Sequence, residues 1–177
     1  MDTWVFSYQT VVYGTVCVDD EATDTDGDTL TFHEECSAGS DPTKADTDDD
    51  GLNDAIEVKG QNQTDPTKAD TDSDGVGDGV EDADQDGVYD SATETDPTKP
   101  DTDGDGLKDG EEDADQDGTK DSGETDPRLA DTDGDGLVDG LEQGVDSSGN
   151  AIPNANPTDP LKADSDGDGL GDAEEDS

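Results

Sequence analysis

Residues 101–112 read Asp-Thr-Asp-Gly-Asp-Gly-Leu-Lys-Asp-Gly-Glu-Glu, and this stretch decides the fold. Aspartate stands at positions 1, 3, 5 and 9, glycine at position 6 and glutamate at position 12. The same pattern returns without exception in segments that begin at Asp46, Asp70, Asp113, Asp131 and Asp164. Repetition at fixed offsets indicates a repeat protein, in which each short unit is one structural module.

The spacing of these carboxylates suits a hard divalent cation. Calcium prefers roughly six to eight oxygen ligands at about 2.4 Å, and a twelve-residue loop can turn the side chains of positions 1, 3, 5, 9 and 12 and the carbonyl of position 7 toward one ion. Glycine at position 6 permits the sharp turn. Calcium ligands are therefore predicted at Asp46, Asp48, Asp50, Leu52, Asp54, Glu57, Asp70, Asp72, Asp74, Val76, Asp78, Glu81, Asp101, Asp103, Asp105, Leu107, Asp109, Glu112, Asp113, Asp115, Asp117, Thr119, Asp121, Glu124, Asp131, Asp133, Asp135, Leu137, Asp139, Glu142, Asp164, Asp166, Asp168, Leu170, Asp172 and Glu175.

One further loop, residues 82–94, keeps the aspartates and Gly87 but has Thr93 at position 12. The nearest carboxylate, Glu94, follows one residue late. We expect this loop to bind metal more weakly, through Asp82, Asp84, Asp86, Val88, Asp90 and Glu94.

Two other segments are more degraded. In the first, Thr29 replaces the glycine and Phe32 replaces the position 9 aspartate. In the second, which begins at Asp146, Ser148 and Asn150 replace the next two aspartates. The sequence leaves metal binding open in both, and the candidate ligands of the first are Asp24, Asp26, Asp28 and Glu35.

The composition favours a cation-binding array over two other interpretations. The chain has 177 residues, of which 54 are acidic and 8 basic, and its formal net charge is −46. Only 24% of residues are hydrophobic, which taken alone is typical of intrinsic disorder. Disorder needs no glycine at position 6, however, and a halophilic surface would scatter its carboxylates. The charge also disfavours nucleic acids and anionic membranes as partners, because both would be repelled.

Electrostatics predict that folding needs calcium. Five carboxylates about 5 Å apart form ten pairs, each repelling by roughly 0.8 kcal/mol in water. A well-buried apolar side chain contributes about 1.5–3 kcal/mol, so pairs such as Leu52 and Ile56 do not offset the entropy of ordering a dozen residues. The array should therefore be loose without calcium and ordered with about six to eight ions. Eight ions would leave a net charge of about −30.

The spacers between loops leave little room for regular structure. The Asp-Pro element they share is typical of a turn, in which proline fixes φ and aspartate accepts from nearby amides. We predict a mostly irregular, metal-nucleated array of calcium loops over residues 46–177, with one helical turn per loop at most. The connectors that contain Asp-Pro begin at Ser40, Thr64, Thr95, Thr125 and Thr158.

The first 18 residues differ in kind from the rest. β-branched and aromatic residues dominate, and Trp4, Phe6 and Tyr8 share one face of a predicted strand. We therefore predict a short β segment at residues 1–18 and a transitional region at residues 19–45.

Cys17 and Cys36 are the only cysteines in the chain. A disulfide between them would close a loop of about 20 residues, and two unpaired thiols are the alternative. Zinc is disfavoured, since two cysteines and His33 fall short of four soft ligands.

Other signals of location are few. No apolar stretch reaches the length of about 18 residues that a membrane span needs, and the N-terminus lacks the features of a secretory signal. Asn62-Gln63-Thr64 is a candidate N-glycosylation sequon at Asn62.

The repeats resemble the thrombospondin type 3 repeats, particularly the bacterial and archaeal versions. The resemblance is carried by residues 95–107, by the adjoining residues 113–118 and by their recurrence over roughly residues 24–177. It implies an extended string of calcium ions wrapped by backbone with almost no secondary structure. It also implies a spacer or adhesive module of a secreted or cell-surface protein.

The predicted function is structural. We expect an extracellular or cell-surface rod, stiffened by calcium, for adhesion, surface display or filament self-assembly. The strand at residues 1–18 would pair with the next copy and produce a homo-oligomer or head-to-tail filament. A calcium-storing or mineral-nucleating protein and the accessory stalk of a secreted enzyme are the alternatives. The chain itself is not expected to be an enzyme, because no activated nucleophile lies near His33 and the paired carboxylates are accounted for as ligands.

Overall fold

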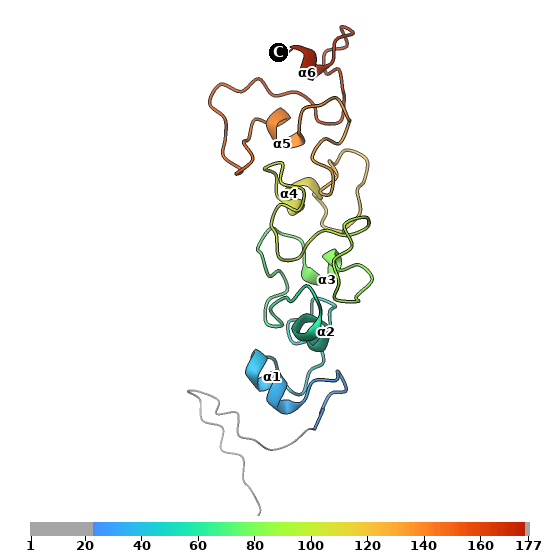
Figure 1. Ribbon diagram of the computed structural model, residues 1–177, viewed down its shortest axis with the longest axis vertical. Coiled ribbons are helices and arrows are strands. Elements are labelled where there is room, and N and C mark those ends of the chain that lie inside the picture. The colour runs from blue at the N-terminus through green and yellow to red at the C-terminus, as the bar shows by residue number, and fades with distance from the viewer. Residues whose placement is uncertain (1–22, 176–177) are drawn as a thin grey trace, which may run out of the picture.

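The computed structural model describes residues 23–175, and every structural statement below concerns that range. Short helices follow one another up a long column in chain order (Figure 1). The rest of the described chain is turn, bend and coil, which confirms a mostly irregular fold. The helices are α1 (Phe32–Ala38), α2 (Asp54–Lys59), α3 (Asp78–Glu81), α4 (Asp109–Glu112), α5 (Asp139–Glu142) and α6 (Asp172–Glu175).

Each helix begins at position 9 of a twelve-residue loop. Position 8 is the N-cap, and in α2 the side chain of Asn53 accepts from the Ala55 amide at 2.9 Å. Helices α3 and α4 stop after one turn, because their C-cap residues, Asp82 and Asp113, already open the next loop. We call the six loops that end in a helix the array loops: residues 24–35, 46–57, 70–81, 101–112, 131–142 and 164–175. Residues 82–94 and 113–124 are the inserted loops.

The prediction of one helical turn at most is wrong for α1 and α2, which have seven and six residues. In α1, Thr31 and Glu34 form a reciprocal capping box, and Gly39 ends the helix at φ 93°. The last turn of α2 carries Lys59, whose charge is favourable at a helix C-terminus. Local capping therefore extends these helices beyond the turn that the loop itself requires.

Regular β structure is almost absent from the described range. One isolated antiparallel bridge, between Val145 and Ala151, is present there. The β segment expected at residues 1–18 lies outside the described residues. That segment and the boundaries after residues 18 and 45 stay predictions.

Carboxylates take many of the places that a hydrophobic core would fill. The buried hydrophobic side chains are Leu30, Leu52, Ala55, Val76 and Leu107. Burying an ionised carboxylate is costly unless a partner compensates it. The interior of the column therefore needs cations or protons. The fully buried acidic side chains include Glu35, Glu57, Glu81, Glu142, Asp54, Asp78, Asp109 and Asp139.

Successive array loops stack through position 10 of one and position 5 of the loop before. A Cβ on Gly110 would lie 2.7 Å from the carbonyl oxygen of Asp74, so at this junction the loops lie closer than a side chain would allow. At the next junction the Gly140 amide donates to Asp105 Oδ2 at 2.6 Å. Each array loop thus sits directly on its predecessor.

The inserted loops pack on the flank of an earlier array loop. Gln85 Nε2 donates to the carbonyl of Gly51 at 3.1 Å, and the Gln61 amide donates to the carbonyl of Gly87 at 2.7 Å. These contacts join residues 82–94 to the array loop at residues 46–57 and to the segment that follows it. Stacking is therefore reinforced from the side.

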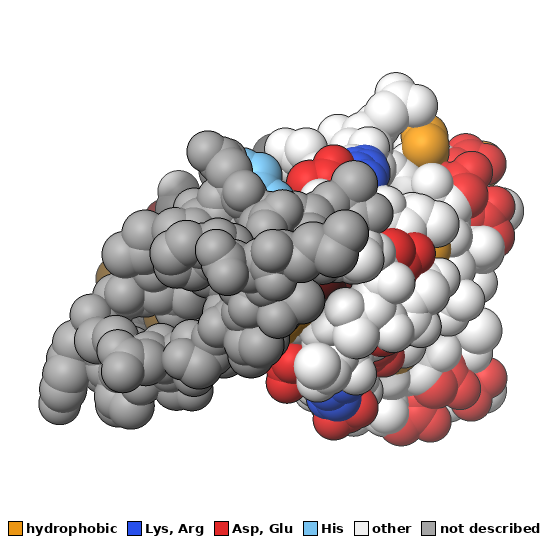
Figure 2. Space-filling view, turned by 90° about the horizontal axis from the view of Figure 1, so that it is seen from below, with side chains coloured by type: hydrophobic (Ala, Val, Ile, Leu, Met, Phe, Trp, Pro, Cys, Tyr) orange, Lys and Arg blue, Asp and Glu red, His pale blue; other side chains and the backbone are white. Residues whose placement is uncertain are grey.

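The Asp-Pro connectors are turns held by their aspartates, as predicted. Asp65 Oδ1 accepts from the amide and hydroxyl of Thr67, and its Oδ2 pairs with Lys68 Nζ at 2.7 Å. Basic side chains pair in the same way with Asp96, Asp126 and Asp159. In the end-on view, Lys and Arg side chains lie beside acidic ones (Figure 2).

The sequon residue Asn62 also joins two connectors. Its Nδ2, the atom to which a glycan would be attached, donates to Asp96 Oδ1 at 2.8 Å. Asn62 is half-buried. A glycan there would leave Nδ2 a single hydrogen to donate, and its presence stays a prediction.

No helix in the described range is long and apolar enough to cross a membrane.

Candidate metal centres

The first aspartate of each array loop shapes the turn. In residues 101–112, Asp101 Oδ1 accepts from the Gly104 amide at 2.7 Å and its Oδ2 from the Gly106 amide at 3.0 Å. Asp105 Oδ1 accepts from the Leu107 amide at 2.8 Å. The backbone thus orients both carboxylates. Equivalent bonds recur in the array loops that begin at Asp24, Asp46, Asp70, Asp131 and Asp164.

Buried carboxylate oxygens without a hydrogen-bond partner gather inside five of the array loops. In residues 70–81 they are both oxygens of Asp72, Oδ2 of Asp74 and both oxygens of Glu81. Such groups are rare and costly. A calcium ion would satisfy several of them at once, so the residues present fit this metal. At least one carboxylate oxygen is likewise buried without a hydrogen-bond partner in Asp26, Asp28, Glu35, Asp48, Asp50, Glu57, Asp103, Glu112, Asp133, Asp139 and Glu142.

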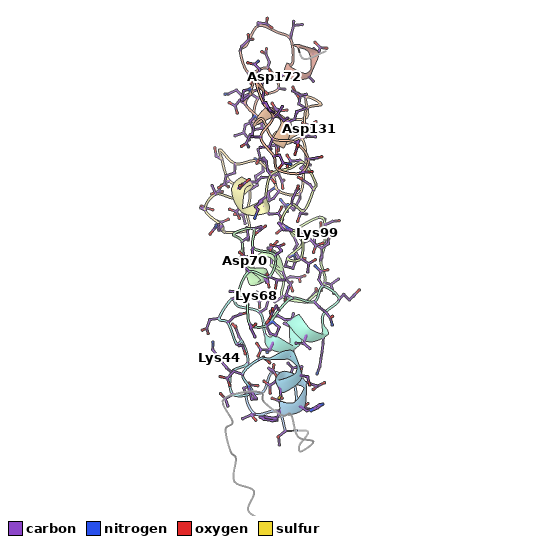
Figure 3. All side chains as sticks on the ribbon, turned by 90° about the vertical axis from the view of Figure 1, so that its left-hand side faces the viewer. Lys44, Lys68, Asp70, Lys99, Asp131 and Asp172 are labelled. Carbon is purple, nitrogen blue, oxygen red and sulfur yellow. The ribbon has the colours of Figure 1, made fainter. Side chains whose placement is uncertain are left out.

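The distances between these oxygens suit a shared ion. Two ligands at about 2.4 Å from one calcium are separated by at most about 4.8 Å. Figure 3 shows Asp70, Asp131 and Asp172 at successive heights, so the candidate sites form a row along the column. Ligand oxygens lie within 4.8 Å of one another in the groups Asp24-Asp26-Asp28, Asp46-Asp48-Asp50 and Asp70-Asp72-Asp74.

Burial and crowding raise the pKa values of the position 12 glutamates. Burial, followed by the charges of Asp74 and Asp72, raises the pKa of Glu81 to about 10. Burial and nearby aspartates likewise raise the pKa of Glu112 to about 9 and that of Glu57 to about 8. Without a cation, protons relieve the crowding. A divalent ion would displace them.

The position 9 aspartate, predicted as a ligand, is held by its own loop. Asp78 Oδ1 accepts from the Thr71 amide at 2.8 Å, and its Oδ2 accepts from the Thr71 hydroxyl at 2.6 Å. The hydroxyl oxygen in turn accepts from the amide of Asp65 in the connector, at 2.9 Å. We call this arrangement the clamp.

The clamp residue at position 2 was missed by sequence reasoning. A visible signal existed, because threonine or serine follows the first aspartate in these loops, whereas Ala83 and Ala114 do so in the inserted loops. The position 2 residue donates to the position 9 aspartate of its own loop in five array loops. These position 2 residues are Thr47, Thr71, Thr102, Thr132 and Ser165.

The clamped aspartate also faces the preceding loop. Asp78 places an oxygen within 4.8 Å of oxygens from Asp50 and Glu57, which are positions 5 and 12 of residues 46–57. Position 9 therefore lies with the candidate ligands of the array loop before its own.

The inserted loops differ in the state of their glutamates. Glu94 Oε1 accepts from the Asp84 amide at 3.3 Å, and its Oε2 accepts from the Asp90 amide at 2.9 Å. Glu124 likewise accepts from the Ala114 amide at 3.1 Å. None of the buried, unpartnered oxygens found in the described range belongs to either inserted loop. Each of these two glutamates therefore has backbone partners within its own loop.

Two C-terminal segments differ from the other predicted sites. Asp146 Oδ1 accepts from the amides of Ser148 and Asn150, each at 3.0 Å, which gives a turn without the carboxylates of an array loop. Residues 164–175 keep the turn and the clamp, but Leu170 is 49% exposed there. Nothing is described for the side chain of Glu175.

Cys36 is disulfide-bonded. Its expected partner, Cys17, lies outside the described residues.

The fold and the sites define a class of protein: a linear array of acidic calcium loops, in which buried carboxylates replace a hydrophobic core. Comparison with known families agrees. The family described as Bacterial TSP3 repeat matches residues 46–69, 101–119 and 131–143. Across residues 46–143 the chain belongs to this family of thrombospondin type 3 repeats, which bind calcium. No curated protein and no solved structure matches the chain.

Proposed function

We propose that this protein is an extracellular or cell-surface spacer, a rod that calcium makes stiff. One observation carries the proposal: buried carboxylate oxygens without partners recur at regular intervals along a column whose hydrophobic core is small. The column has a defined shape only if those charges are compensated. Calcium then acts as the structural material of the rod.

Contacts between neighbouring loops would transmit the stiffness. Lys108 Nζ donates to the carbonyl of Ser73 at 2.8 Å, and the Ala173 amide donates to Asp135 Oδ2 at 3.2 Å. Each of these bonds joins one array loop to the next. In such one-dimensional arrays, ordering one unit favours ordering its neighbours.

The number of ions follows from the two kinds of loop. We expect the six array loops to bind calcium first and the two inserted loops to bind it more weakly, which gives six to eight ions. The rod would keep a large negative charge in either case, because the chain starts from −46. Self-repulsion of that size favours extended, soluble particles.

An extracellular location is supported by two features. Disulfides persist in oxidising compartments, and Cys36 is disulfide-bonded. Calcium sites of extracellular modules work at concentrations of about 0.1–1 mM, where even modest affinity suffices. Self-assembly through residues 1–18 stays a prediction.

Small-angle scattering in calcium and in EDTA tests the proposal. The expected result is a rod-like particle in millimolar calcium that becomes a flexible chain on chelation. A calcium store would bind a similar number of ions without a defined shape. The same compact particle in EDTA, or no calcium bound at millimolar concentration, would contradict the proposed rod.

A further inference from the structure

The loop at residues 24–35 lies outside the matched family repeats and breaks their pattern twice. Thr29 stands at the glycine position and Phe32 at the position 9 aspartate. The backbone nevertheless follows the other array loops. Thr29 takes φ 84°, and its amide donates to Asp24 Oδ2 at 3.1 Å, as the equivalent glycine amides do elsewhere.

The interior of this loop holds carboxylates that need a partner. Glu35 is fully buried, and neither of its carboxylate oxygens has a hydrogen-bond partner. Asp28 is 3% exposed, and its Oδ2 is also unpartnered. Two buried carboxylates side by side are tolerated only if a cation or a proton compensates their charge.

The next repeat adds a third carboxylate to this pair. Asp54, at position 9 of residues 46–57, places an oxygen within 4.8 Å of oxygens from Asp28 and Glu35, and all three residues are buried. The Thr47 amide and hydroxyl hold the two oxygens of Asp54 at 2.7 Å each. Each carboxylate oxygen has two lone pairs, so Asp54 can accept these bonds and still bind an ion.

We propose that residues 24–35 form a calcium site that the following repeat completes. The loop supplies carboxylates from positions 1, 3, 5 and 12, and Asp54 closes the site from the next repeat. The inference rests on the proposed function, since it requires an array that binds calcium. The ligands are Asp24, Asp26, Asp28, Glu35 and Asp54.

This assignment explains why Phe32 is tolerated at position 9. If position 9 serves the loop before its own, an aspartate there is needed only where an array loop precedes. No Asp-x-Asp-x-Asp segment occurs in residues 1–23. Residues 1–23 therefore supply no array loop that an aspartate at position 32 could complete.

The same arrangement returns one repeat later. Asp78 places an oxygen within 4.8 Å of oxygens from Asp50 and Glu57. Asp54 has the same relation to Asp28 and Glu35. Binding an ion in one loop then favours docking of the next loop, and docking favours binding. The occupancy of each loop is therefore coupled to the stacking of the loop that follows it.

Calcium titration of the full chain, followed by NMR of the His33 ring, tests this site. His33 is the only histidine, and it lies on α1 two residues before Glu35, so its ring signals report on this loop. Wild type should show a calcium-dependent transition. Glu35→Gln should raise its midpoint by at least roughly tenfold, and Asp54→Asn by roughly tenfold, because each removes a charged ligand. Saturating calcium should restore the wild-type signal in Asp54→Asn, which shows that the variant folds.

One control isolates the role of Asp54. Asp49→Asn removes a charge from an exposed aspartate that pairs with Lys44, and it should leave the midpoint near that of wild type.

The outcomes separate this inference from the proposed function. An Asp54→Asn midpoint equal to that of Asp49→Asn overturns completion by the next repeat. Native mass spectrometry of the same samples counts the ions bound. Calcium bound without any response of His33 overturns only the site at residues 24–35, whereas no calcium bound at all overturns the proposed function as well.

Discussion

Glu81 and Glu94 end two adjoining loops of closely similar sequence, yet they meet opposite surroundings. Both oxygens of Glu81 are buried without a hydrogen-bond partner. Both oxygens of Glu94 accept backbone amides, from Asp84 at 3.3 Å and from Asp90 at 2.9 Å. Glu81 therefore needs a cation or a proton, whereas Glu94 is satisfied by its own loop.

The difference does not come from the late position of Glu94. Glu124 stands at position 12, as Glu81 does, and still accepts the amides of Ala114 and Asp121. The inserted loops share alanine at position 2 and end without a helix. In the array loop, Thr71 holds position 9 where the helix begins, and that helical turn carries Glu81 into the interior. The same acidic motif thus gives either a loop whose glutamate is buried without a partner or a loop whose glutamate accepts backbone amides.

The largest expected effect is the response of the array loops to chelation. In EDTA, amides of residues 70–81 should lose protection against hydrogen exchange by at least about 100-fold, because chelation removes the ion that compensates the buried carboxylates. Residues 82–94 should follow to a smaller extent, since their glutamate has backbone partners. Hydrogen-exchange mass spectrometry measures both. Equal protection with and without calcium would contradict the distinction.

The next effect compares the two glutamates directly. Glu81→Gln should remove one bound ion or weaken it by about 10- to 100-fold, because it takes away a charged ligand. Glu94→Gln should leave the ion count of the array loops unchanged and lower the free energy of unfolding in calcium by about 1 kcal/mol, since one of the two backbone amides loses its acceptor. Native mass spectrometry and urea unfolding separate the two outcomes. Loss of an ion in Glu94→Gln alone would reverse our assignment.

A pH effect should distinguish the same pair. In the metal-free fold the pKa of Glu81 is raised to about 10 and that of Glu112 to about 9, so the folded state holds more protons than the unfolded state above about pH 4.5. Stability without calcium is therefore greatest below that pH and falls as pH rises toward 9–10. Calcium must displace these protons, so binding should release protons and tighten from pH 6 to pH 8. Calorimetry in buffers of different ionisation enthalpy measures the release, which should shrink in Glu81→Gln but not in Glu94→Gln.

The smallest effect concerns the clamp. Thr71→Ala gives the array loop the position 2 residue of an inserted loop and should lower the free energy of unfolding by about 0.5–1.5 kcal/mol, the value of one hydrogen bond. Thr71→Ser keeps the hydroxyl and should cost less. Ala83→Thr in the inserted loop serves as the reciprocal control and should not create a new ion site. Thermal unfolding in saturating calcium compares the three, and equal stability of the alanine and serine variants would remove the clamp from the explanation.

Local spacing in the sequence determined much of this molecule. Aspartate at positions 1 and 5 and a residue with positive φ at position 6 form a turn from neighbouring residues alone, so the candidate loops and the irregular fold were predictable. The Asp-Pro connectors were predictable for the same reason. The extra turns of α1 and α2 were not predicted, although Thr31 and Gly39 are cap signals that the sequence displays.

The tertiary structure alone decided which carboxylates are left without partners. Asp54 belongs to one loop by sequence but lies with Glu35 of the loop before, and the Gly140 amide reaches Asp105 across 35 residues. Such contacts depend on how the repeats stack. The twelve-residue motif alone does not predict which residues of a neighbouring repeat it will contact. The sequence of each loop therefore determines where an ion can bind. The stacking of the repeats determines which buried carboxylates require an ion.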